Sequence, residues 1–118
     1  MPRVQIPITA VAETGTTEPA AVTGDAVNDH YLDGGTDCIV ECSNTSAGSL
    51  DVTFVTSYST AGGIALADNV ITVAAGVTRL VKLKGNGVRV FYKQSADSDR
   101  IYVDVTSNSW EFRAYAIT

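Results

Sequence analysis

The sequence predicts an all-β protein: a single antiparallel β-sandwich or jelly roll of seven or eight strands, with an extended N-terminal arm. Three observations lead to this prediction. The 118 residues include 15 Val and 14 Thr, which favour strands, and 10 Gly, which suit frequent turns. Short segments alternate apolar and polar side chains, the period of a strand with one buried face. No window of 11 residues has convincing helical periodicity.

The chain length indicates one domain with two unequal parts. A folded monomer of this size exposes roughly 6,100 Å² against roughly 18,000 Å² when unfolded, which is enough burial for one core. Residues 1–24 contain all three prolines and no aromatic residue. We therefore expect residues 1–24 to form an extended arm and residues 25–118 to form the sandwich.

The arm begins with a segment of partial strand character. Val4 to Val11 alternates apolar and polar residues, but Pro7 cannot donate a hydrogen bond to a sheet. We expect this segment to pair at a sheet edge or with a neighbouring subunit, and the alternative is a terminus that is docked locally or frayed. The predicted partner-binding residues are Arg3, Val4, Gln5, Ile6, Pro7 and Ile8.

The sandwich begins with a polar connection at residues 25–36, which contains three Asp and a Gly34–Gly35 turn. Short strands separated by turn residues follow. Their predicted ranges are 38–43, 50–58, 70–73, 78–84, 88–93, 100–106 and 110–117.

The alternation assigns a face to many of these side chains. Three sets are expected to point to the core: Leu50, Val52 and Phe54; Ile101, Val103 and Val105; and Trp110, Phe112, Ala114 and Ala116. Tyr102 and Tyr115 fall on the opposite faces. Outward aromatic residues, together with the loop acids Asp97 and Asp99, leave open a carbohydrate- or receptor-binding module.

Signatures of an enzyme are scarce, and we expect none of the residues to be catalytic. His30 is the only histidine, so any nucleophile–histidine arrangement must use it. A lone His in a polar loop is more often solvated or held by one structural hydrogen bond. Most carboxylates lie in turns, where Asp usually caps its own backbone. Neither a calcium loop nor a phosphate-binding loop is present in full, so no metal and no cofactor are expected.

Cys38 and Cys42 are the only thiols. Four residues along one strand separate their Cα atoms by about 13 Å, too far for an internal disulfide. We expect two buried thiols on either side of Val40, and the alternative is an intermolecular disulfide in an assembled particle.

Charge and hydropathy exclude several classes of protein. A formal net charge of −5 argues against a nucleic-acid partner, since phosphate contacts need clustered Lys and Arg. No window approaches the roughly 20 apolar residues of a membrane helix. Gln5, Pro7 and Thr9 interrupt the apolar run that a secretory signal would need, so no export signal is expected.

Several segments, taken in order, resemble small β-sandwich structural proteins of tailed bacteriophages, described as capsid decoration or auxiliary head proteins. The segments are Val4–Thr9, Val22–Ala26, Asn28–His30, Val52–Thr56, Gly63–Asn69 and Val70–Arg79. The resemblance covers almost the whole chain and carries over no catalytic residue.

The resemblance implies a non-enzymatic virion protein that stabilises the capsid by binding between capsomers. It implies the major capsid protein as partner, a homo-oligomer with a trimer favoured, assembly in the host cytoplasm and a final location on the capsid surface. A head–tail connector or tail subunit is the other structural role left open.

Overall fold

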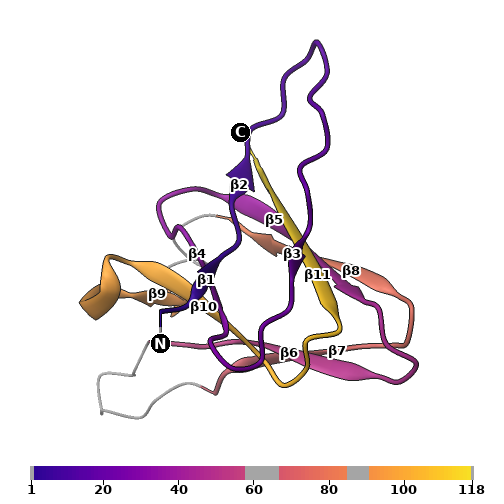
Figure 1. Cartoon of the computed structure of the whole chain (residues 1–118). Coiled ribbons are helices and arrows are strands. Elements are labelled where there is room, and N and C mark those ends of the chain that lie inside the picture. Colours follow the sequence, from indigo (N-terminus) through magenta and orange to yellow (C-terminus); the bar gives the residue numbers. More distant parts are fainter. Residues whose placement is uncertain (1, 58–66, 85–90, 118) are drawn as a thin grey trace.

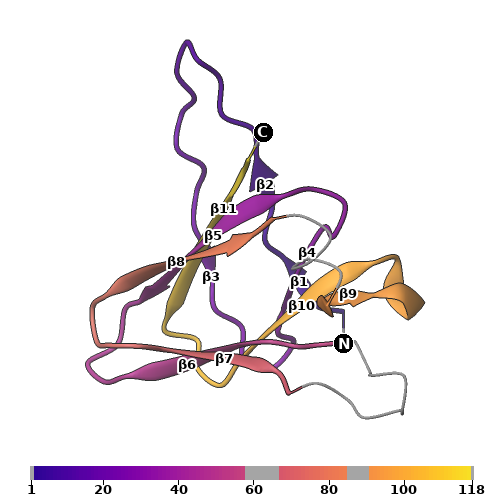
Figure 2. The ribbon, with the colours of Figure 1, turned by 180° about the vertical axis from the view of Figure 1, so that it is seen from behind.

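The computed structural model, which describes residues 2–57, 67–84 and 91–117, confirms an all-β sandwich. Two sheets pack face to face (Figures 1 and 2). Within the described ranges, the strands of three or more residues are β4 (His30–Leu32), β5 (Cys38–Asn44), β6 (Leu50–Phe54), β7 (Asn69–Val73), β8 (Thr78–Leu83), β10 (Arg100–Val105) and β11 (Trp110–Ala116). Two-residue strands are β1 (Val4–Gln5), β2 (Ile8–Thr9), β3 (Val22–Thr23) and β9 (Lys93–Gln94), and η2 (Ser95–Asp97) is a 3₁₀ turn.

Sheet A has the order β1-β4-β10-β6-β7, with β9 also paired to β10, and sheet B has the order β2-β11-β5-β8, with β3 also paired to β11. The long strands pair antiparallel. However, β1 runs parallel to β4 and β2 runs parallel to β11. The sandwich is therefore antiparallel in its long strands, and its sheets are mixed only where the N-terminal segment pairs with β4 in sheet A and then with β11 in sheet B.

The core confirms the faces that the alternation assigned. Burial along β10 and along most of β11 alternates residue by residue, with Trp110, Phe112 and Ala114 inward. Strand β5 lies between β11 and β8 and is the central strand of its sheet. The fully buried large side chains from both sheets are Trp110, Phe54, Phe112, Ile6, Leu32, Leu83, Ile101, His30, Val40, Val52, Val73 and Val103.

The extended arm predicted for residues 1–24 is not confirmed. Ile6 is 0 % exposed and belongs to the core cluster, and its N–H donates to the carbonyl of Tyr31 at 2.9 Å. Pro7 lies between β1 and β2, where the chain crosses from sheet A to sheet B. At a crossing between ladders the missing N–H of proline breaks no pairing, so Pro7 does not exclude the segment from the sandwich.

One part of the N-terminal region does project. Between β2 and β3 the chain leaves the sandwich, extends beyond it near the C-terminus and returns (Figure 1). Residues 10–18 are all exposed. This projecting loop (residues 10–21) is the part of the predicted arm that lies outside the core.

Three predicted elements differ in extent. The predicted polar connection contains β4, and the strand predicted for 50–58 ends at Phe54, after which the N–H of Thr56 donates to the carboxylate of Asp68. Tyr58 and residues 88–90 of the strand predicted for 88–93 lie outside the described residues, and of residues 91–93 only Lys93 is in a strand, the two-residue β9.

Candidate functional site

The predicted partner-binding residues near the N-terminus mainly contact the chain itself. Arg3 pairs with Asp104, donates to the carbonyl of His30 and stacks over the ring of Tyr102 at 3.8 Å. Ile6 fills the core. Val4, Gln5 and Pro7 are exposed, and Ile8 is half-buried. The segment therefore closes one side of the sandwich, and the side chains of Val4, Gln5 and Pro7 stay exposed on it.

His30 was expected in a polar loop, but it lies in β4 and is 0 % exposed. Its Nε2 accepts the N–H of Asp25 at 2.9 Å, and its Nδ1 donates to the carbonyl of Val4 at 3.2 Å. The ring packs edge-on against Phe112 at 5.1 Å. Both ring nitrogens are thus used, which assigns a structural role to the only histidine.

The outward tyrosines of sheet A are covered rather than open. Tyr102 lies under Arg3 and donates its hydroxyl to Asp97 at 2.6 Å, and this hydrogen bond raises its pKa. Tyr31 lies under Arg100 at 4.2 Å. Because guanidinium groups occupy these ring faces, the two tyrosines do not form an open stacking platform for a sugar.

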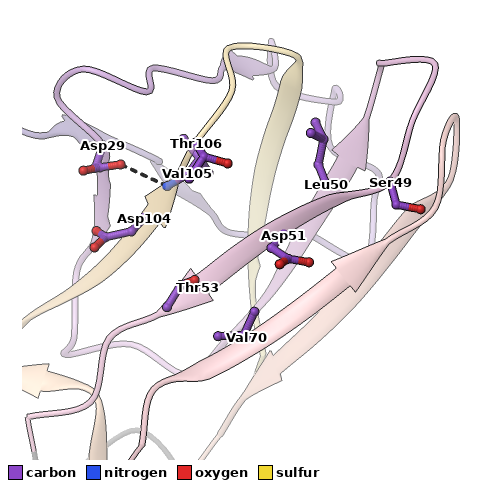
Figure 3. A pocket seen from close by; sticks show the side chains of 9 residues that line it. All are labelled: Asp29, Ser49, Leu50, Asp51, Thr53, Val70, Asp104, Val105 and Thr106. Carbon is purple, nitrogen blue, oxygen red and sulfur yellow. Dashed lines mark hydrogen bonds between the residues drawn. The ribbon is translucent and has the colours of Figure 1, made fainter.

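A hollow of about 600 Å³ lies on the outer face of sheet A. Figure 3 shows Asp29 and Asp104 on one side of it and Asp51 on the other. Asp29 accepts the N–H of Val105 at 2.9 Å, Asp51 accepts the hydroxyl of Thr72 at 2.6 Å, and Asp104 pairs with Arg3. Each carboxylate therefore already has a structural partner, and the hollow offers no assembled acid–base pair.

Both cysteines are buried on the inner face of β5, as the alternation predicted, and no disulfide joins them. Burial raises the pKa of Cys42 to about 12. A bridge between chains would require one of these sulfur atoms to leave the core. The buried-thiol interpretation fits the structure, and the alternative of an intermolecular disulfide would need local opening.

A further candidate is the outer edge of β8 (Thr78–Leu83), called the β8 edge below. Strand β8 is the last strand of sheet B, so no described strand pairs with its outer side. The carbonyl of Val77 faces β5, where it accepts the N–H of Asn44 at 3.0 Å. Main-chain groups alternate sides along an antiparallel strand, so Thr78, Leu80 and Lys82 direct their N–H and C=O groups away from the sheet.

Leu80 adds one exposed apolar side chain to these outward main-chain groups. Leu80 is 66 % exposed and the adjacent Val77 is 43 % exposed. Sequence reasoning assigned the strand but missed its position at an edge. The sequence carried no signal for the edge, but it did signal an apolar outer face, because Leu80, Val81 and Leu83 fall on both faces of one strand. That pattern does not fit a strand with one solvent face and one core face.

The projecting loop is a second surface with an exposed apolar side chain. It is anchored at its base, where Arg113 donates to the carbonyl of Pro19 at 3.0 Å and pairs with Glu18 at 3.3 Å. At its tip, the N–H of Gly15 donates to the carbonyl of Ala12 at 3.0 Å. Val11 is 63 % exposed, so the loop presents an apolar side chain beyond the body of the sandwich.

Within residues 2–57, 67–84 and 91–117, no group of three or more His, Cys, Asp or Glu side chains is placed to hold a metal ion. No helix in the described part of the chain has the length and apolarity to cross a membrane. Comparison of the chain with protein-family models, curated proteins and solved structures gives no match, so the interpretation of these surfaces rests on their own geometry.

Proposed function

We propose that this protein is a non-enzymatic structural protein of a bacteriophage virion, which binds the major capsid protein between capsomers and stabilises the capsid. The observation that carries the proposal is the β8 edge. It offers outward main-chain groups on a six-residue strand together with the exposed side chain of Leu80. An extended segment of a partner can add to such an edge as one further strand.

The chemistry of the β8 edge indicates what kind of segment fits. Main-chain hydrogen bonds would supply affinity, and side chains at alternate positions would supply specificity. Lys82 is exposed and shares the outer face with Leu80. A partner strand with an apolar residue opposite Leu80 and a carboxylate opposite Lys82 is complementary. Charged residues on an edge also limit pairing with unselected strands, which suits a protein that must stay dispersed before assembly.

Two further features support a role on the outside of a capsid. The projecting loop reaches beyond the sandwich and gives each copy a second contact point. The net charge of −5 disfavours contact with packaged nucleic acid. In this proposal the copies assemble as a small symmetric homo-oligomer, with a trimer favoured, and attachment depends on strand edges and apolar patches.

Imaging of purified virions, with the copy number per particle, tests the proposed function. We expect density for this sandwich at repeated positions between capsomers over the whole head. Density restricted to one vertex would contradict the decoration role and would favour a connector or tail subunit. Absence of the chain from purified virions would contradict any virion role.

A pair of variants tests the β8 edge itself. Leu80→Pro removes an N–H that points away from the sheet, so the pairing with β5 is retained while the edge is blocked. Leu80→Thr is the matched control, because it removes the apolar side chain but keeps the N–H and suits a strand. We expect Leu80→Pro to lose capsid occupancy and Leu80→Thr to keep part of it. Equal occupancy for Leu80→Pro and the unmodified protein would refute attachment through this edge.

A further inference from the structure

The N-terminal layer (residues 2–29) is held to the sandwich by few main-chain bonds. Its three strands β1, β2 and β3 have two residues each. Segments that depend on so few ladder bonds open more readily than central strands. Side-chain contacts therefore also hold the layer, and they include Ile6 in the core, the Arg3–Asp104 pair and the buried ring of His30.

His30 joins two parts of the layer that are distant in sequence. Through Nδ1 it holds the carbonyl of Val4 in β1, and through Nε2 it holds the N–H of Asp25 in the connection between β3 and β4. The N–H of Val4 is in turn bound by the carbonyl of Asp29 at 2.9 Å. The ring also packs on Phe112 of β11, so one side chain ties both segments to the core.

The partners of the ring define its protonation state. The Val4 carbonyl can only accept, so Nδ1 carries the hydrogen. The Asp25 N–H can only donate, so Nε2 must offer its lone pair. This arrangement requires a neutral imidazole. A second proton on Nε2 would face the N–H of Asp25, which would remove that hydrogen bond and place two donors against each other.

Charged groups around the ring both raise and lower the pKa of His30. Arg3 disfavours the imidazolium, whereas Asp25 and Asp29 favour it. Asp104, on the adjacent strand β10, is paired with Arg3. Burial is the largest effect, and the balance lowers the pKa of His30 below its ordinary value of 6.5. Hydrogen bonds from the main chain and side chain of Asn28 also lower the pKa of Asp25.

We propose that His30 is a proton-operated latch, and that protonation of its ring releases the N-terminal layer while the rest of the sandwich stays folded. Above pH 6.5 the ring is neutral whether the layer is closed or open, so the latch contributes fully. As the pH falls below 6.5, the open form gains a proton before the closed form does, and opening becomes more favourable. This proposed role of His30 does not depend on the proposed virion function.

Amide hydrogen exchange, measured by NMR between pH 7 and pH 5, tests the latch. Protection factors corrected for the intrinsic pH dependence are compared for Val4, Ile6 and Asp25 and for the central strand β5. We expect the protection of the N-terminal amides to fall by up to about tenfold per pH unit below 6.5, since one unit of pKa difference changes the equilibrium tenfold. The β5 amides should keep their protection.

Two variants separate the latch from general acid sensitivity. His30→Gln keeps a hydrogen-bonding side chain that does not titrate, and His30→Phe keeps a ring that can pack against Phe112. Both should open more readily than the unmodified protein at pH 7 and should lose the pH dependence between 7 and 5. If neither variant folds, the pH dependence of amide protection in the unmodified protein tests the proposal by itself. Protection that does not change with pH, or that falls equally in β5, would overturn the proposal, as would an unchanged pH dependence in a folded variant.

Discussion

Replacing Ile6 by alanine tests whether the first nine residues belong to the fold. The side chain is 0 % exposed and contributes to the core cluster. Ile→Ala removes three carbon atoms, worth about 2.4 kcal/mol at about 0.8 kcal/mol for each buried methylene. A residual cavity adds to this, so the expected loss in the free energy of unfolding is about 2–5 kcal/mol. An arm outside the core would predict a loss near zero.

Thermal unfolding followed by circular dichroism or calorimetry measures this loss. At roughly 2.1 cal/mol/K per residue, a chain of 118 residues unfolds with an entropy of about 250 cal/mol/K. A loss of about 3 kcal/mol then lowers Tm by about 12 °C. Val4→Ala is the matched control, because Val4 is 36 % exposed and a surface change is expected to alter stability by about 0.5 kcal/mol or less. Equal Tm values for the two variants would refute the placement of Ile6 in the core.

Two further predictions concern close packing and the thiols. Gly34→Ala should destabilise the fold strongly, because an added Cβ would collide with the carbonyl oxygen of Asp99. Gly48→Ala should be tolerated, since nothing lies within 4 Å of its added Cβ. Urea unfolding of both variants measures the difference, and equal unfolding midpoints would contradict the close approach of Gly34 to Asp99. Cys38 and Cys42 should react with a thiol reagent at pH 8 only after denaturation, because both are buried and the pKa of Cys42 is raised to about 12. Rapid labelling of the native protein would contradict their burial. Cross-linked chains on non-reducing electrophoresis would contradict it as well.

The class of fold and the inward faces of the long strands could be predicted because both follow from local pattern. A strand repeats every two residues, so Ile101, Val103 and Val105 share a face wherever β10 is placed in the sheet. The same argument predicted that Cys38 and Cys42 lie on one buried face, where the structure places them. Aspartates in turns were also predictable, since Asp25 accepts the N–H groups of Val27 and Asn28 within its own turn.

The N-terminal segment could not be placed from its sequence. Proline and polar residues at positions 1–24 are typical of a loop, and the two-residue strands β1 and β2 are too short to leave a periodic signal. Their pairing depends on which strands present a free edge, namely β4 in sheet A and β11 in sheet B. Pro7 would disrupt a single continuous strand from Val4 to Val11, but it lies between the two separate strands β1 and β2.

The all-β class and the inward residues of each long strand follow from local pattern, because alternation along a strand is a property of neighbouring residues. The same pattern favoured buried thiols. Three features depend on the arrangement in space: Ile6 fills the core, His30 is buried with both nitrogens bonded, and β8 ends its sheet with Leu80 exposed. Each of these depends on what lies beside a segment in space, and the strand order that sets those neighbours is not encoded in the local pattern.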